Sequence, residues 1–198
     1  MNQLRFYSKL KLSFIFAAVC LSYNARAVEL PQNGIFQQTC KTINEDDYVQ
    51  FEIRLQKDGS ASGADRFVFS VAAFEDENCL SPYLLISREF DVDTYDGKNL
   101  NLITNKITYT SLTDEVTSAL NLSRYCGIKS WQTKKPQEVS GRKCNDYLQL
   151  AKNQKYFQIL SFEFDRLLFG SESREYNGLT EKSRPIGFES LPYNLKTR

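Results

Sequence analysis

The sequence contains no histidine. Any chemistry that this chain performs would therefore rest mainly on its carboxylates, arginines and cysteines. Histidine is the usual general base near neutral pH, a member of common hydrolase triads and a frequent metal ligand. The sequence also lacks a glycine-rich phosphate loop and a serine-elbow motif. We therefore expect a protein that is not an enzyme and that uses no metal or other cofactor.

Carboxylate chemistry stays open, since acidic residues cluster in three places along the chain. The clusters are residues 45–47, residues 75–77 and the set Asp91, Asp93 and Asp96. Each lies at a predicted turn or strand end, where solvated acids are ordinary. The last set resembles a calcium loop only superficially, because Gly97 comes one position late and Leu102 stands where the loop needs glutamate. Asp76 has a better structural role, which is to cap the turn that delivers Cys79.

Two arginines, Arg88 and Arg166, are the best candidates for a binding role. Arg88 precedes Phe90 by two positions and Arg166 follows Phe164 by two, so each shares the parity of apolar residues in its predicted strand. A charged side chain that faces a barrel interior is costly unless it is paired or binds an anion. We expect these four residues to mark a ligand cavity. The alternative is that both guanidinium groups reach solvent at strand ends.

Four of the five cysteines follow the first segment, which is the arrangement of an exported, disulfide-bonded protein. They are Cys40, Cys79, Cys126 and Cys144. Four cysteines allow three connectivities, and the residues alone do not choose among them. We favour the sequential pairing, because it closes two moderate loops without crossing. The absence of a C-x-x-C pair disfavours a redox or zinc centre.

The first segment has the pattern of a cleaved secretory signal. Its early cations are Arg5, Lys9 and Lys11. An apolar run over residues 12–21 follows, and Ala25–Ala27 supplies small residues before the expected cleavage point. We predict a signal peptide over residues 1–27 and a single domain over residues 28–198.

Removal of that segment would take four of the 25 basic residues and no acidic residue, leaving 21 against 24, a formal net charge of −3. A mildly acidic chain without a basic block lacks the electrostatic footprint of a nucleic-acid-binding protein. No later stretch reaches the ~18–20 apolar residues of a membrane-spanning helix. We expect no nucleic acid partner, no span in the mature chain, and a periplasmic or extracellular address.

Alternation of apolar and polar residues dominates the rest of the chain and predicts β-strands joined by short turns. The expected strands cover residues 49–55, 66–74, 83–93, 99–109, 155–169 and about 184–193. Thr113 can cap a short helix over residues 113–122, and a polar loop follows between the last two cysteines. This order predicts an all-β fold, an antiparallel up-and-down barrel of about eight strands with one short helix. The alternative is a two-sheet β-sandwich.

Two short motifs resemble a known family. Gly34-x-Phe36-x-x-x-Cys40 is followed by Phe74-x-Asp76-x-x-Cys79. This pattern is similar to the extracellular domain of the adenomatosis polyposis coli down-regulated family of Wnt inhibitors, and to small exported bacterial proteins that look alike. The resemblance covers mainly residues 34–93 and implies a lipocalin-like barrel with a bridge between the two motif cysteines.

The same resemblance extends weakly to the end of the chain. Gly34-x-Phe36 together with Arg184-Pro185 is similar to the lipocalin arrangement in which a first-strand aromatic residue packs under a late arginine. We therefore expect Gly34, Phe36, Asp76 and Arg184 to be structural residues.

The expected function is non-enzymatic binding of a hydrophobic or amphipathic small molecule, such as a lipid, inside the barrel. Aromatic residues could either line such a cavity or fill the interior. The alternative is an envelope or extracellular scaffold that contacts a protein partner with its outer surface or with the loop between Cys126 and Cys144.

Overall fold

Four long antiparallel strands form the main wall of the molecule, and they follow from the alternating pattern of their residues. The computed structural model describes residues 33–43, 47–57 and 65–196. The predicted signal peptide lies outside these residues. The strands are β3 (Tyr48–Gln56), β4 (Arg66–Phe74), β5 (Pro82–Tyr95) and β6 (Asn99–Ser111).

The remaining elements either complete the barrel or lie outside its ring of strands. Short strands near the N-terminus are β1 (Gly34–Gln37) and β2 (Lys41–Thr42). After β6 come α1 (Asp114–Ser123), the 3-10 helix η1 (Tyr125–Gly127), β7 (Gln137–Glu138), β8 (Lys143–Cys144) and β9 (Tyr147–Leu148). The chain ends with β10 (Lys155–Glu163), β11 (Arg166–Phe169), the 3-10 helix η2 (Glu181–Ser183) and β12 (Tyr193–Leu195).

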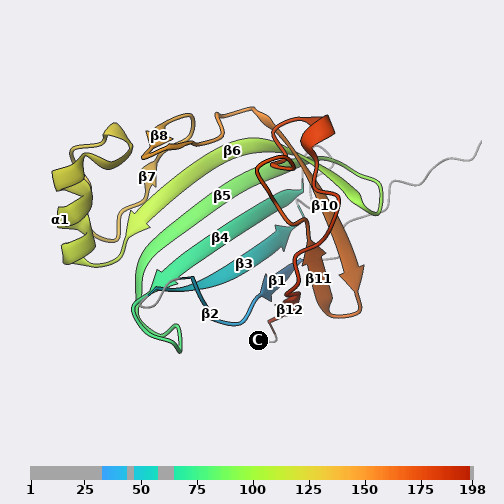
Figure 1. The fold of residues 1–198 in the computed structure, drawn as a ribbon, viewed down its shortest axis with the longest axis horizontal. Helices are drawn as coiled ribbons and strands as arrows, with labels where there is room; N and C mark the ends of the chain where they lie inside the picture. The colour runs from blue at the N-terminus through green and yellow to red at the C-terminus, as the bar shows by residue number, and fades with distance from the viewer. Residues whose placement is uncertain (1–32, 44–46, 58–64, 197–198) are drawn as a thin grey trace, which may run out of the picture.

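Hydrogen bonds run in a closed ring through eight strands. The order is β1, β12, β11, β10, β6, β5, β4 and β3, and β3 pairs again with β1. Figure 1 shows the four long strands curving from one side of the molecule toward β10 and β11 on the other. The prediction of an all-β barrel with one α-helix is confirmed, and ring closure distinguishes it from an open sandwich.

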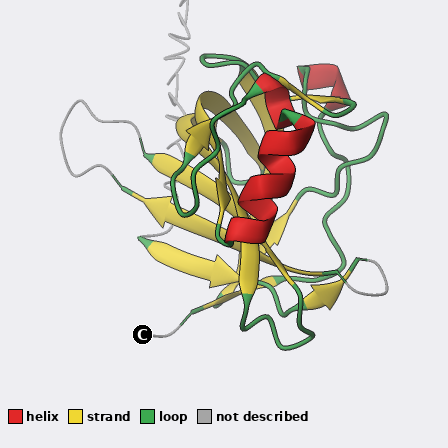
Figure 2. Ribbon diagram, turned by 90° about the vertical axis from the view of Figure 1, so that its left-hand side faces the viewer, coloured by secondary structure: helices red, strands yellow, loops and turns green. Residues whose placement is uncertain are grey.

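The helix begins where the sequence predicts. The hydroxyl of Thr113 accepts a hydrogen bond from the amide of Val116 at 3.3 Å, so Thr113 is the N-cap. Figure 1 shows α1 beside the end of β6, away from β10 and β11, and Figure 2 shows this helix, in red, in front of the strands. Within the described parts of the chain, no helix is long and apolar enough to cross a membrane.

Both cysteine pairs are sequential. Cys40 is bonded to Cys79 and Cys126 to Cys144. The first bridge ties the turn after β4 to the segment after β1, and the second ties β8 to η1. The favoured connectivity is therefore confirmed.

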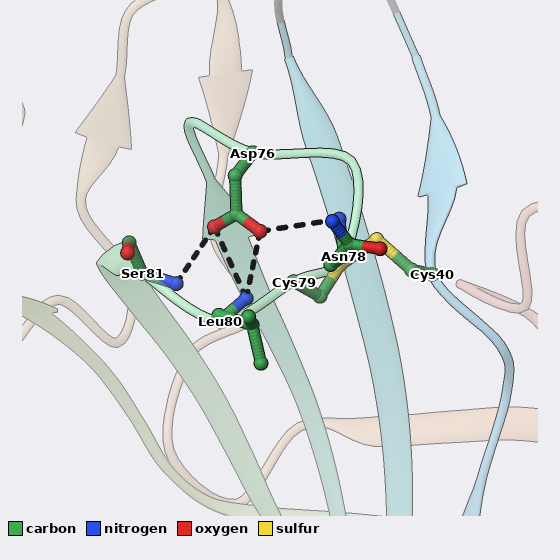
Figure 3. Close-up of a disulfide and its surroundings, with 6 residues drawn as sticks. All are labelled: Cys40, Asp76, Asn78, Cys79, Leu80 and Ser81. Atoms are coloured by element: carbon green, nitrogen blue, oxygen red, sulfur yellow. Dashed lines mark hydrogen bonds between the residues drawn. A yellow bond between two sulfur atoms is a disulfide. The ribbon is translucent and has the colours of Figure 1, made fainter.

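Asp76 organises the turn that carries the first bridge. Its carboxylate accepts hydrogen bonds from the backbone amides of Asn78, Leu80 and Ser81, at distances of 2.7 to 3.1 Å (Figure 3). These bonds lower the pKa of the Asp76 carboxyl. Cys79 adopts a left-handed backbone conformation, with φ of 53°, inside this turn. The capping role expected of Asp76 is present.

The last part of the chain differs from the prediction. Residues 184–193 do not form a long strand, and only β12 pairs with β1 and β11. Pro185 and Pro192 lack backbone N–H groups, which weakens this stretch as a strand. The predicted strand over residues 155–169 is likewise divided, because the chain turns between Glu163 and Arg166.

The expected packing of Phe36 under Arg184 is wrong. Phe36 faces the core beside Phe162, with ring centroids 6.0 Å apart. Arg184 lies over the ring of Phe157, 5.3 Å from its centroid, and donates a hydrogen bond to the Asn101 side chain. Phe157 and Asn101 pair with each other on the outer parity of β10 and β6. The two residues therefore lie on opposite faces of the barrel wall.

The barrel interior is packed along half of its length. Phe90 stacks on Tyr156 with a centroid distance of 5.4 Å, and Phe67 stacks on Phe169 at 5.5 Å. The other fully buried members of this region include Ile53, Leu100, Leu102, Leu160 and Leu167. In the opposite half, the inner-facing residues Phe51, Phe69 and Ile86 stay only partly buried. Burial of the inner-facing side chains therefore decreases along the barrel axis.

Candidate functional site

An open cavity of about 940 Å³ lies where β6 and β10 diverge. β10 pairs with β6 only from Asn99 to Ile103, and the second half of β6 pairs with the short β7. The cavity is bounded by β5, β6, η1, the β8–β9 hairpin, the start of β10 and residues 172–179. Its size lies within the roughly 300–1,000 Å³ of typical small-molecule sites.

Arg88 extends into the cavity from β5. It pairs with Phe69 of β4 and Ile107 of β6, both on the inner parity of their strands. Along β5 it stands between partly buried Ile86 and fully buried Phe90, where the burial of inner-facing side chains decreases. Of the two orientations that the sequence left open for Arg88, the strand register shows the inward one.

No hydrogen-bond or ion-pair partner is present for Arg88 among the residues that the structure describes. Its Nε atom is buried and unpaired. Carboxylates near it act at longer range, since Arg88 lowers the pKa of Glu172 without forming a salt bridge within 4 Å. A guanidinium group in this position has the geometry and charge to pair with an anion.

Three tyrosines form the aromatic part of the wall: Tyr109, Tyr125 and Tyr156. Tyr109 and Tyr125 pack against each other with ring centroids 6.0 Å apart, and Tyr125 packs on Trp131 at 6.4 Å. Burial raises the pKa of Tyr109 and of Tyr125, so both hydroxyls stay protonated in the physiological range.

The hydroxyls of Tyr109 and Tyr156 accept hydrogen bonds from amide side chains. Gln149 donates to Tyr109 at 3.2 Å, and Gln158 donates to Tyr156 at 2.8 Å. The described residues provide no acceptor for the O–H groups of these tyrosines. Each can therefore donate to a molecule in the cavity.

A carboxylate stands on the same cavity wall. Gln158 donates a hydrogen bond to Oε1 of Glu172 at 2.9 Å. The pKa of the Glu172 carboxyl is raised, chiefly because the surrounding protein partly removes the group from water. The positive charge of Arg88 opposes this shift, and the negative charge of Glu189 adds to it. Part of Glu172 remains exposed where the cavity opens to solvent.

The second interior carboxylate, Glu189, is held by neutral donors. Gln38 donates to its Oε2 at 2.7 Å, and the hydroxyl of Tyr193 donates to the same atom at 3.2 Å. Burial, followed by the nearby Glu189, raises the pKa of Tyr193 strongly. Tyr193 therefore remains a neutral donor to Glu189.

Exposed apolar residues surround the cavity mouth. Tyr147 and Leu148 of the β8–β9 hairpin are 77% and 75% exposed, and Leu179 faces the same opening at 48%. The bridge between Cys126 and Cys144 holds this hairpin in place. An apolar rim beside a polar floor is suited to an amphipathic molecule.

The remaining ligand residues predicted from the sequence lie elsewhere. Phe90 is buried and does not line the cavity, although it stacks on the lining residue Tyr156. Phe164 is fully exposed in the turn between β10 and β11, and Arg166 is exposed on the outer parity of β11. The expectation that Arg166 shares the inner face is wrong, because this turn reverses the parity and leaves Leu167 inside.

The acidic clusters have structural contacts instead of a shared site. Asp93 forms an ion pair with Lys155 at 3.0 Å, and Asp96 accepts hydrogen bonds from the backbone of Lys98 and Asn99. Residues 44–46 fall outside the described part of the chain. Where the structure describes the chain, no group of three or more potential ligand residues could hold a metal ion.

The chain matches no protein-family model, and no curated protein matches it significantly. The interpretation of the site therefore depends on its geometry.

Sequence reasoning missed Glu172, Gln149 and Tyr125. All three lie outside long strands, so no alternation of apolar and polar residues indicates their orientation. Tyr156 could have been found, because it shares the parity of Leu160 and Phe162 along β10.

Proposed function

We propose that this protein binds a hydrophobic or amphipathic small molecule, such as a lipid, in the cavity beside Arg88. The single observation that carries the proposal is the open cavity of about 940 Å³, which combines tyrosine rings with a guanidinium group that has no partner among the described residues. Fully packed interiors leave no such space. Arg88, Tyr109 and Tyr156 extend this cavity to the inner face of the barrel wall, which supports a guest beside the core.

The proposed role is binding without catalysis. The chain has no histidine. The carboxylates of Glu172 and Glu189 each accept a hydrogen bond from a neutral donor. This arrangement supports a binding site more than an acid–base pair.

We also propose that the protein is exported, to the periplasm or the extracellular space. Two disulfides support an oxidising compartment. The cationic and apolar pattern of residues 1–27 supports a secretory signal. A relationship with the adenomatosis polyposis coli down-regulated family remains a proposal, which the barrel and the bridge between Cys40 and Cys79 support.

Native mass spectrometry of the oxidised protein from its own host tests the binding role. A small molecule bound in stoichiometric amount, then extracted and analysed, is the expected result. A bare polypeptide under gentle conditions, together with no binding of added dodecanoate or dodecanol, would contradict the proposal.

A pair of matched variants locates the binding site. Leu148→Asp places a charge on the cavity rim, whereas Leu122→Asp changes a leucine on α1 that is also largely exposed. We expect the first variant to weaken dodecanoate binding by about tenfold, corresponding to about 1.4 kcal/mol, and the second to leave it unchanged. Equal effects of both variants would place the ligand elsewhere.

A second candidate function is a protein-interaction scaffold. The observation that favours it is the exposure of Tyr147 and Leu148 on a disulfide-held hairpin, since exposed aromatic and apolar residues often anchor protein partners. Partner capture from host extract that is lost in Leu148→Asp, without any bound small molecule, would favour this function over lipid binding.

A further inference from the structure

Resting on the binding role proposed above, we propose that the ligand is an amphipathic acid whose carboxylate or phosphate group pairs with Arg88. The apolar part of the molecule then lies toward the rim formed by Tyr147, Leu148 and Leu179. An alcohol or an amine with the same chain is a poor ligand.

The first step is the position of the cation. Arg88 is on the inner face of β5, and its Nε is removed from solvent without a hydrogen-bond partner among the described residues. Leaving a donor of a charged group unpaired is costly, and an arginine fork matches the two oxygens of a carboxylate or phosphate. The oxygens of a bound acid would supply the hydrogen-bond acceptor that Arg88 lacks among the described residues.

The second step is a surplus of donors at the same wall. The hydroxyls of Tyr109 and Tyr156 already accept hydrogen bonds from Gln149 and Gln158, so their own hydrogens remain free to be donated to another acceptor. The described residues supply no such acceptor. Arginine and two hydroxyl donors on one wall favour a ligand that brings oxygen acceptors.

The third step concerns the carboxylates of Glu172 and Glu189, whose negative charges would repel a bound anion. Glu172 lies on the cavity wall, whereas Glu189 does not line the cavity but repels the charge of Glu172. Both accept hydrogen bonds from neutral groups, namely Gln158 for Glu172, and Gln38 and Tyr193 for Glu189. Neither forms an ion pair with Arg88, so the guanidinium remains available. Loss of charge at Glu172 should therefore strengthen the binding of an acid.

The test compares three ligands with the same alkyl chain: dodecanoate, dodecyl phosphate and dodecanol, each below its micelle concentration. Affinities are measured by titration calorimetry with the oxidised mature protein. We expect at least one acid to bind about tenfold more tightly than the alcohol, the range of a charge-assisted hydrogen bond. Tighter binding of dodecanoate would identify a fatty-acid-like ligand, and tighter binding of dodecyl phosphate a phosphorylated one.

Variants then assign the preference to Arg88. Arg88→Met keeps an unbranched side chain without charge, and Arg166→Met makes the same change at an exposed outer position. We expect Arg88→Met to lose the tenfold preference while dodecanol binding changes by less than about twofold. Arg166→Met should keep the preference.

The possible failures are distinguishable. If none of the three ligands binds, the proposed function itself fails. If dodecanol binds the unaltered protein as tightly as both acids, the acid preference is wrong while the cavity remains a binding site. If Arg88→Met weakens acid and alcohol equally, Arg88 is a structural residue. The ligand comparison on the unaltered protein holds even if Arg88→Met fails to fold.

Discussion

Gln158 donates a hydrogen bond of 2.9 Å to the carboxylate of Glu172, and this contact links the inner face of β10 to the segment after β11. Gln158 is fully buried, whereas Glu172 faces the cavity opening. The link fixes one wall of the cavity and places a titratable group beside Arg88.

The pH dependence of stability should report on Glu172. Its pKa is raised in the folded protein, so the folded state holds the proton more tightly than the unfolded state. The corresponding stability is complete below the ordinary glutamate pKa and is lost as pH rises through the raised value. Glu172→Gln keeps an oxygen for Gln158 but cannot ionise.

We expect Glu172→Gln and the unaltered protein to have the same free energy of unfolding near pH 4, measured with urea. At about pH 8, the variant should be the more stable of the two. Glu163→Gln, an exposed change at the end of β10, is the control. A difference between Glu172→Gln and the unaltered protein that does not vary with pH would contradict the raised pKa.

The contribution of Asp76 to stability should depend on pH in the opposite direction from that of Glu172. Backbone amides of Asn78, Leu80 and Ser81 lower its pKa, so its contribution to stability is present above the ordinary aspartate value and is lost as pH falls through the lowered one. Asp76→Asn should lower the melting temperature at neutral pH. The gap to the unaltered protein should close in acid, and a constant gap would mean that the charge does not matter.

The two disulfides should separate stability from binding. Replacing either pair by serine should cost about 2–4 kcal/mol of unfolding free energy, measured with urea. Only the change at Cys126 and Cys144 should also weaken dodecanoate binding, because Cys144 lines the cavity and precedes the hairpin of Tyr147 and Leu148. The pair Cys40 and Cys79 is the matched control. Equal losses of affinity would show that binding depends on global stability.

The fold was largely predictable because period-two alternation is a local signal. Strand β3 alternates between buried and exposed residues toward its end, and Thr113 supplies a cap that short-range chemistry identifies. The orientation of Arg88 followed from the same parity. Prediction failed where parity changes within a segment, since Arg166 lies just beyond a turn that the apolar pattern does not reveal.

The cavity was less predictable than the barrel. Its wall combines β5, β6 and β10 with irregular segments near residues 125, 149 and 172. The approach of these segments depends on long-range packing and on the bridge between Cys126 and Cys144, not on local propensity. Arg184 shows the same limit, because its partner ring is Phe157 and not the expected Phe36.

Substitution of Phe164 should change the stability of the protein without changing its affinity for dodecanoate. It occupies the turn between β10 and β11 with φ of 58°, and its side chain is fully exposed. A left-handed conformation costs an ordinary L-residue roughly 1–2 kcal/mol, and asparagine tolerates it better. Phe164→Asn should therefore raise the free energy of unfolding by roughly 0.5–1 kcal/mol, measured with urea.

Phe164→Ala is the control for this change, because alanine removes the aromatic ring but keeps the Cβ atom in the left-handed turn. It should give no comparable gain. Both variants should bind dodecanoate as tightly as the unaltered protein, since Phe164 lies outside the cavity wall. Weaker binding in both variants would restore Phe164 as a ligand contact, whereas lower stability in both would mean that its ring packs on a neighbouring surface.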